Sequence, residues 1–169
     1  MFRDYPYLFD GTPDNEIRYL KKFATTKDAV IFAVCDGERI VGCDTSSALG
    51  GNDEQVTAWL AAAGYDIDRF FYFRGMVLLA EYRGHGIGRT FCDHREAYVR
   101  SRGYSHSAFC SVIRPANHPL KPANYWPLDG FWLKRGYRKV EHLVVSVAWK
   151  DVDEDQETEH PMQFWMREL

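Results

Sequence analysis

The segment RGHGIG at 83–88 holds three glycines within five residues, and these are the residues best placed to do chemistry. An apolar run, RFFYFRGMVLLA (69–80), precedes them, and a stretch with helical spacing follows. Strand, glycine-rich turn and helix can bind a phosphate, because the first helical N–H groups lack internal partners and lie at the positive end of the helix dipole. Glycine lets an anion approach the backbone closely. The segment therefore predicts an anion-binding loop.

The familiar nucleotide-binding patterns do not fit these glycines. A dinucleotide GxGxxG would need glycine at the position of Arg89, and a mononucleotide loop would need Gly-Lys followed by Ser or Thr. The pattern that fits is R-x-x-G-x-G, beginning at Arg83. The alternative is a tight turn in which the glycines serve chain geometry alone.

Hydrophobic periodicity and turn residues predict the elements that position this loop. The acidic stretch 153–160 reads as a solvated turn between the last two strands. Together the elements predict an α+β domain on a mixed sheet. In chain order they are a helix over 12–26 capped by Thr12, a hairpin over 29–49 turning at Asp36-Gly37, a helix over 52–64 capped by Asn52 or Asp53, a central strand over 69–80, a helix from 87 to 103, a strand over 105–113, a short helix around 127–135 and closing strands over 139–152 and 162–169.

Composition narrows the class of protein. The 169 residues are 46% hydrophobic and 15% aromatic, which predicts one globular domain. A formal charge of −3 without a basic stripe argues against nucleic acid as a partner. No apolar run approaches the roughly 20 residues of a membrane span, and no signal peptide opens the chain, so we expect a cytoplasmic protein without a membrane partner. Four scattered cysteines predict reduced thiols and no metal site.

Placed after VLLAEY, the R-x-x-G-x-G pattern resembles the acetyl-CoA loop of the GNAT superfamily of N-acetyltransferases. In that superfamily a strand, a short helix ending in Gly-Phe or Gly-Tyr, and two terminal strands follow the loop and its helix. FWLKRGY at 131–137 occupies the place of that short helix, so the resemblance covers roughly 29–169. The stretch 113–136 also resembles a subgroup of uncharacterised acetyltransferases, some of them fused to carbon–nitrogen hydrolases.

The resemblance implies a GNAT-like acyl-CoA N-acyltransferase fold, with a mixed central sheet flanked by helices in a single domain over 1–169. Residues 69–113 would form the acetyl-CoA-binding core, and 114–169 the acceptor side with the closing strands. The superfamily normally opens with a strand, and residues 1–28 show none, so this part reads as incomplete. Either the start codon is internal or the first strand is missing. An exposed sheet edge in the first case would favour a homodimer.

The resemblance also implies which residues bind acetyl-CoA. Backbone N–H groups of about 85–90 would cradle the pyrophosphate, with Arg83 bracing the loop and Arg89 adding charge, although both arginines also suit a solvated helix start. Backbone groups of Leu78 and Leu79 would pair with the pantetheine arm, and the Leu78 N–H would polarise the thioester carbonyl as an oxyanion donor. The implied cofactor-binding set is Leu78, Leu79, Arg83, Gly84, His85, Gly86, Ile87, Gly88, Arg89 and Thr90.

Acetyl transfer to an amine also requires a proton acceptor, because an alkylammonium group has a pKa near 10. In the superfamily a glutamate on the central strand commonly serves as base, and a tyrosine on the late helix as acid. Here Arg74 and Gly75 stand in place of the glutamate, and Trp132 in place of the tyrosine. Replacement candidates are Tyr125, which would share a helix face with Trp132 if the helix began early, and Glu81. The alternative for Tyr125 is that it packs in the interior, and the alternative for Glu81 is that it faces solvent.

Four side chains are candidates for the acceptor pocket: Asp44, Arg74, His118 and Asp129. Arg74 suggests an anionic group on the acceptor, whereas the two aspartates suggest a cationic one, and Asp129 also suits an ordinary helix start. Cys92 and Cys110 raise the question of an acyl-enzyme, but buried thiols more often pack as small apolar groups. We therefore expect direct transfer in a ternary complex.

The favoured function is an acetyl-CoA-dependent N-acetyltransferase that acts on an amine of a small molecule or peptide. The first alternative is a catalytically weak coenzyme A or acyl-CoA-binding module. The missing glutamate and tyrosine support this alternative. The second is a fold used only for protein interaction.

Overall fold

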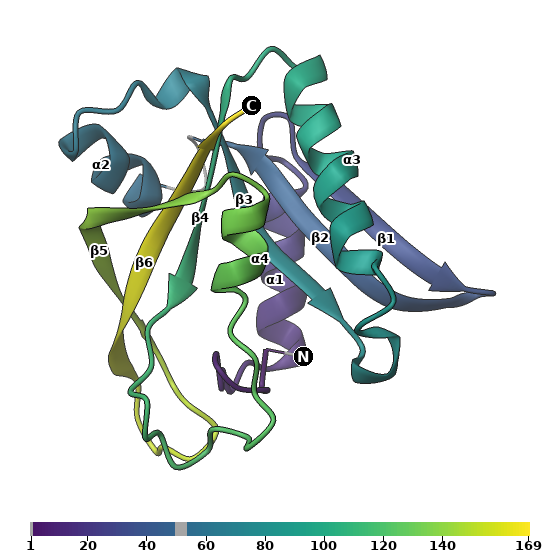
Figure 1. Cartoon of the computed structure of the whole chain (residues 1–169), viewed down its shortest axis with the longest axis vertical. Coiled ribbons are helices and arrows are strands. Elements are labelled where there is room, and N and C mark those ends of the chain that lie inside the picture. Colours follow the sequence, from purple (N-terminus) through teal and green to yellow (C-terminus); the bar gives the residue numbers. More distant parts are fainter. Residues whose placement is uncertain (1, 50–53) are drawn as a thin grey trace.

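Residues 2–49 and 54–169 are described in the computed structural model, and one mixed sheet organises them (Figure 1). The strands lie in the order β1-β2-β3-β4-β6-β5. Neighbouring strands are antiparallel except β3 and β4, which are parallel. The strands are β1 (Val30–Asp36), β2 (Arg39–Ala48), β3 (Phe70–Leu78), β4 (His106–Val112), β5 (Arg138–Trp149) and β6 (Thr158–Glu168).

Helices cover both faces of this sheet (Figure 1). Phe71 and Phe73 pack with residues of α3 and α4, whereas Phe70 packs with α2 on the opposite face, because successive side chains of a strand alternate. Arg74 lies 5.4 Å from the ring of Phe23, which places α1 on the α2 face. The helices are α1 (Pro13–Phe23), α2 (Glu54–Ala62), α3 (Ile87–Ser101) and α4 (Asp129–Lys134), with the single-turn 3-10 helices η1 (Ile67–Arg69) and η2 (Ala80–Tyr82).

The divergence of β3 and β4 is the feature that positions the site. The two strands pair only over Phe70–Tyr72 and His106–Ala108. Beyond Tyr72, β3 stays bonded to β2 and β4 to β6. Along β3, Gly75 pairs with Thr45 but Phe73 pairs with Ser46, which leaves Arg74 as the extra residue of a β-bulge. A bulge of this kind re-aims side chains and bends the strand.

The predicted α+β architecture is confirmed, with differences at element ends. Thr12 caps α1 by accepting the Asn15 N–H at 3.3 Å, and the hairpin turns at Gly37 with a φ of +58°. The proposed caps Asn52 and Asp53 lie outside the described residues. The expected turn over 153–160 is wrong at its end, because β6 already begins at Thr158.

Among the described residues before α1, the only bridge to another segment is that between Phe9 and Asp151, so no strand precedes α1 there. Within the described ranges, none of the helices has the length and apolar character to cross a membrane.

Candidate active site

The loop after β3 presents an uncovered helix N-terminus. Gly84 and Gly86 have φ values of +82° and +83°, a region that side chains with a Cβ adopt at a cost. Gly86 caps α3 without a side-chain hydrogen bond, and no acidic residue lies in the first turn of α3. By contrast, α1 has a Thr12 cap and two acidic residues in its first turn. The positive end of the α3 dipole is therefore left without a side-chain counter-charge.

Arg83 ties this loop to two other segments. Its Nε donates to the Leu78 carbonyl at 3.1 Å, and its Nη2 lies 2.9 Å from Asp4 in the N-terminal segment. Arg89 points to solvent with an exposed fraction of 78% and lies 4.0 Å from Asp93 one turn further along α3. Arg83 thus has the contacts of a brace, whereas Arg89 offers a solvated charge at the loop edge.

Backbone donors on β3 face away from β2 at alternate residues. The Leu79 N–H donates to the Val41 carbonyl at 3.0 Å, so it is committed to β2 and cannot pair with the pantetheine arm as expected. Since N–H directions alternate along an antiparallel strand, the N–H groups of Leu78 and Met76 point toward the β4 side, beyond the paired segment. The expected donor Leu78 thus points away from β2, and so does Met76, which the period of two along the strand would have indicated.

Asp44 does not line an acceptor pocket, contrary to expectation. Its carboxylate is fully buried and lies 3.3 Å from the guanidinium of Arg95, which is only 2% exposed. Burial raises the pKa of Asp44. Arg95 in turn stacks 3.9 Å over the ring of Phe73. Asp44 therefore belongs to the core beneath α3.

Glu81 and Asp129 are both engaged in surface ion pairs. Glu81 lies 3.6 Å from Arg39, and both side chains are more than half exposed. Asp129, at the start of α4, lies 2.6 Å from Lys139 of β5. These contacts argue against Glu81 as the base and against Asp129 as an acceptor contact.

Tyr125 and His118 meet at the N-terminal segment. Because α4 begins only at Asp129, Tyr125 lies outside the helix, so the early helix start that a face shared with Trp132 required does not occur and Tyr125 follows the packing alternative. Tyr125 instead packs edge-to-face on Tyr5 with a centroid separation of 4.6 Å, and His118 lies 5.7 Å from the same ring. Burial raises the pKa of Tyr125.

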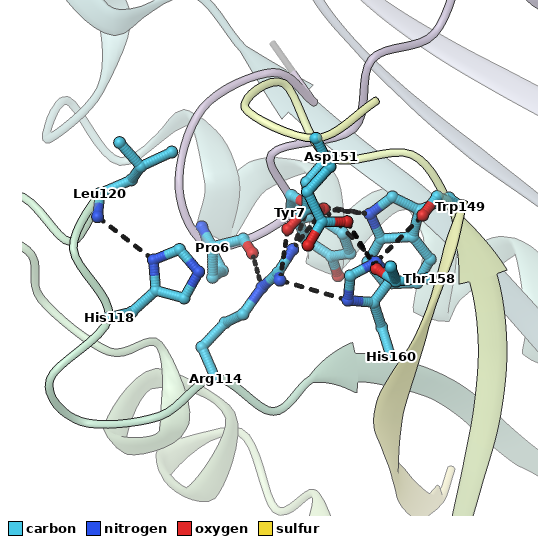
Figure 2. A network of polar contacts seen from close by, with 10 residues as sticks. Pro6, Tyr7, Arg114, His118, Leu120, Trp149, Asp151, Thr158 and His160 are labelled. Carbon is cyan, nitrogen blue, oxygen red and sulfur yellow. Dashed lines mark hydrogen bonds and ion pairs between the residues drawn. The ribbon is translucent and has the colours of Figure 1, made fainter. Parts of the chain in front are cut away.

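A buried arginine holds the N-terminal segment in place (Figure 2). Arg114 forms a two-pronged ion pair with Asp151, at 2.6 and 2.8 Å. It also donates to the carbonyls of Pro6 and Tyr7, at 2.8 and 2.7 Å. Trp149 donates its indole N–H to Asp151 at 2.8 Å. No sequence motif marked Arg114, because Pro6, Tyr7 and Asp151 all lie far away in the chain.

The same cluster holds the one group of potential metal ligands found among residues 2–49 and 54–169. Ligand atoms of Asp151, Glu154 and His160 lie within 4.8 Å of one another. The Asp151 carboxylate, however, already accepts hydrogen bonds from Arg114 and Trp149. The guanidinium therefore serves as its counter-ion.

Cys92 and Cys110 have the environment of inert thiols. Cys92 is fully buried, and burial raises its pKa. Burial also raises the pKa of Cys110 to about 12. Since only the thiolate is an effective nucleophile, both thiols are poor candidates for carrying an acyl group.

A cationic cavity lies between α3, α4 and β6. Its volume is about 570 Å³. Glu96 is paired with Arg135 at 3.0 Å and with Arg167 at 2.8 Å. The cavity begins at Arg89, beside the N-terminus of α3, and is lined by Arg89, Asp93, Glu96, Phe131, Lys134, Arg135 and Arg167.

Comparisons with known proteins agree with this geometry. The model of the acetyltransferase (GNAT) family matches residues 2–123. No curated protein matches the chain. A GCN5-related N-acetyltransferase from Kribbella flavida is 14% identical, with 94% of this chain and 79% of that chain covered and a TM-score of 0.58.

Two further solved structures contain the cofactor. A GNAT family acetyltransferase from Elizabethkingia anophelis with acetyl-CoA bound is 13% identical, with 97% of this chain and 90% of that chain covered and a TM-score of 0.52. The PaiA N-acetyltransferase from Thermoplasma acidophilum, in complex with coenzyme A, is 9% identical, with 92% and 70% covered and a TM-score of 0.53. At these identities the likeness concerns the fold.

Proposed function

The chain belongs to the GNAT family of acetyltransferases, and on that premise we propose that it transfers the acetyl group of acetyl-CoA directly to an amine of a small molecule or peptide. The observation that carries the proposal is the uncovered N-terminus of α3, set behind Gly84 and Gly86 beyond the segment over which β3 and β4 pair. Pyrophosphate suits that site, because backbone N–H groups and the helix dipole both favour an anion there.

The residues present fit coenzyme A along its length. A Cβ built at Gly84 or Gly86 would meet nothing within 4 Å, so the loop surface is open to a ligand. The pantetheine arm would lie beside β3 like an added strand. It would pair with the Leu78 N–H nearest the glycine loop and with the Met76 N–H two residues before it. Arg89 and Lys134, on the wall of the cationic cavity, would face the ribose phosphate of coenzyme A, which is separate from the pyrophosphate.

In the reaction, the amine nitrogen attacks the thioester carbonyl carbon, and the new N–C bond forms as the C–S bond breaks with its electron pair on sulfur. The proton that the nitrogen loses ends on this sulfur, so the products are the amide and the coenzyme A thiol. The Met76 or Leu78 N–H would donate to the carbonyl oxygen as it gains charge. The raised pKa of Cys110, about 12, supports direct transfer without an acyl-enzyme.

A catalytically weak coenzyme A-binding module is the second candidate. It is favoured by Trp132, which stands where the family's tyrosine is expected and is only 8% exposed, its ring 4.6 Å from that of Phe109. Trp132 serves the core and offers no hydroxyl. Thiol release in the presence of an amine separates this candidate from the enzyme.

The experiment that tests the proposal is calorimetric titration of coenzyme A into the wild type, Gly86→Asp and Gly86→Asn. Asparagine tolerates the left-handed backbone and has nearly the shape of aspartate, so the pair isolates the negative charge. We expect Gly86→Asp to lose at least tenfold more affinity than Gly86→Asn.

Gly103→Asp is the matched control, because Gly103 has a φ of +82° and open space but follows the other end of α3. It should bind coenzyme A like the wild type. Equal affinity of Gly86→Asp and Gly86→Asn, or absence of binding by the folded wild type, would remove the loop from the cofactor site.

A further inference from the structure

The ring of Phe2 occupies a seat on β3 next to the proposed thioester position. A Cβ built at Gly75 would lie 3.0 Å from Phe2 Cζ and 3.7 Å from Thr45 Oγ1, so a side chain at this position would press against the ring. Gly75 directly precedes Met76, whose N–H faces the β4 side. Whatever replaces Phe2 in this seat would therefore lie close to the reacting carbonyl.

The surroundings of the seat are aromatic. Tyr7 packs edge-to-face on Phe2 with a centroid separation of 5.5 Å, and its hydroxyl donates to the Cys110 carbonyl of β4 at 3.5 Å. Tyr5 and Tyr125 form the neighbouring edge-to-face pair. Such pairs prefer ring edges against ring faces, a geometry that a ligand ring in the place of Phe2 would reproduce.

The charges near the seat disfavour a polycationic acceptor. The two aspartates of the N-terminal segment are engaged in ion pairs: Asp4 with Arg83, and Asp10 with Arg3 and Lys150. Arg74, one residue before Gly75, donates to the Ser47 hydroxyl at 2.9 Å. A second ammonium group on the acceptor would find Asp4 and Asp10 already paired with other cations.

We propose that the acceptor is an aromatic monoamine whose ring takes the seat of Phe2 over Gly75. This inference rests on the proposed function and names its substrate class. When the ring of Phe2 swings away, the aromatic amine packs on Gly75 and Tyr7 with its nitrogen toward the Met76 side of β3. Phe2 and Gly75 are then the residues that determine specificity.

The test compares phenethylamine with spermidine and n-butylamine as acceptors, following thiol release from acetyl-CoA. For the wild type we expect a kcat/KM for phenethylamine at least roughly tenfold above both others, since a well-filled apolar pocket discriminates on that scale. Phe2→Ala removes the competing ring and should lower the KM for phenethylamine about three- to tenfold. Gly75→Ala presses a methyl group against the ring in the seat and should increase that KM.

Phe32→Ala is the control, because Phe32 is also half-buried but lies on β1 against His94; it should match the wild type. Binding of phenethylamine to the coenzyme A complex, measured by calorimetry, keeps the acceptor site testable without turnover. Binding that tightens in Phe2→Ala without thiol release would support the seat and defeat the transferase.

Thiol release with spermidine at an equal or higher kcat/KM would support the transferase and overturn the aromatic seat. The seat would also be overturned if phenethylamine did not bind to the coenzyme A complex, or if Phe2→Ala and Gly75→Ala changed its KM or its affinity in the same direction.

Discussion

The buried Asp44–Arg95 pair shows how a residue suited to binding can instead serve the core. Two opposite charges with side chains exposed by 2% or less are expensive to desolvate, and their attraction repays that cost only while both are present. The Arg95 Nε has no hydrogen-bond partner among the described residues, so the pair is not fully satisfied even now. Removing one partner should therefore lower the free energy of unfolding more than breaking the surface ion pair Glu81–Arg39 or Asp129–Lys139 would.

We predict that Asp44→Asn destabilises the protein by about 3–5 kcal/mol, because the Arg95 charge loses its counter-ion in the core. Asp129→Asn, which breaks an ion pair with both partners about half exposed, should cost at most about 1 kcal/mol. Urea unfolding of both variants measures the difference. A small cost for Asp44→Asn together with a raised acceptor KM would return Asp44 to the acceptor pocket.

Side-chain pairing is also where sequence reasoning fails at this scale. The loop glycines could be predicted, because a positive φ at Gly84 and Gly86 is a local backbone demand. Asp44 was misassigned because its partner lies 51 residues further along the chain. The prediction of Glu81 as the base failed for the same reason, because Arg39 comes close to it only once β2 has folded. Local backbone conformation can be predicted from the spacing of residues along the sequence. The ion-pair partner of a charged side chain cannot, because the fold brings it from a distant segment.

At the scale of elements, the N-terminal segment is held by side chains and by one short backbone bridge, between Phe9 and Asp151. Its carbonyls at Pro6 and Tyr7 accept from Arg114, and the Tyr7 carbonyl also accepts from the Trp149 indole at 3.1 Å. The guanidinium and indole thus supply donors to the carbonyls that lie before this bridge. The proposed seat of Phe2 depends on this clamp.

We predict that Arg114→Met frees residues 2–10 and costs about 3 kcal/mol or more, because Asp151 is left buried without its counter-ion. Amide hydrogen exchange of residues 2–10, measured with urea unfolding, checks both effects. Arg102→Met is the control, since Arg102 is half exposed and its loss should cost at most about 1 kcal/mol. Unchanged protection of residues 2–10 in Arg114→Met would show that the clamp is dispensable.

Element order could be predicted from sequence, but the start of β6 could not. Thr158–His160 read as part of an acidic turn, yet they pair with Val147–Trp149 of β5, and that pairing outweighs their polar composition. The start of α4 at Asp129, by contrast, lies close to the expected helix around 127–135, and Tyr125 before it packs on Tyr5. Only the β6 boundary depends on pairing with a segment that spacing does not reveal.

At the scale of the whole molecule, stability should depend on pH through neutral groups buried on the α1 face. Burial raises the pKa of the Tyr7 hydroxyl and of the Cys110 thiol to about 12 each, from ordinary values of 10 and 9. Burial also raises the pKa of Tyr72 well above its ordinary value. Folding thus favours the protonated forms, while the unfolded chain releases these protons at a lower pH.

The sign follows from linkage: a raised folded pKa contributes stability that is fully present below the unfolded pKa and is lost as pH rises toward 12. We predict a nearly constant free energy of unfolding from pH 7 to about 9 and a steep fall above it. Tyr7→Phe combined with Cys110→Ala removes two of the responsible groups, so its curve should fall less steeply, by roughly 1 kcal/mol per pH unit for each group. Urea unfolding at pH 8, 9, 10 and 11 measures both slopes. If the free energy of unfolding fell in parallel with pH for the wild type and the double variant, these two groups would ionise without unfolding the protein. The α1 face would then be more accessible to water than its packing indicates.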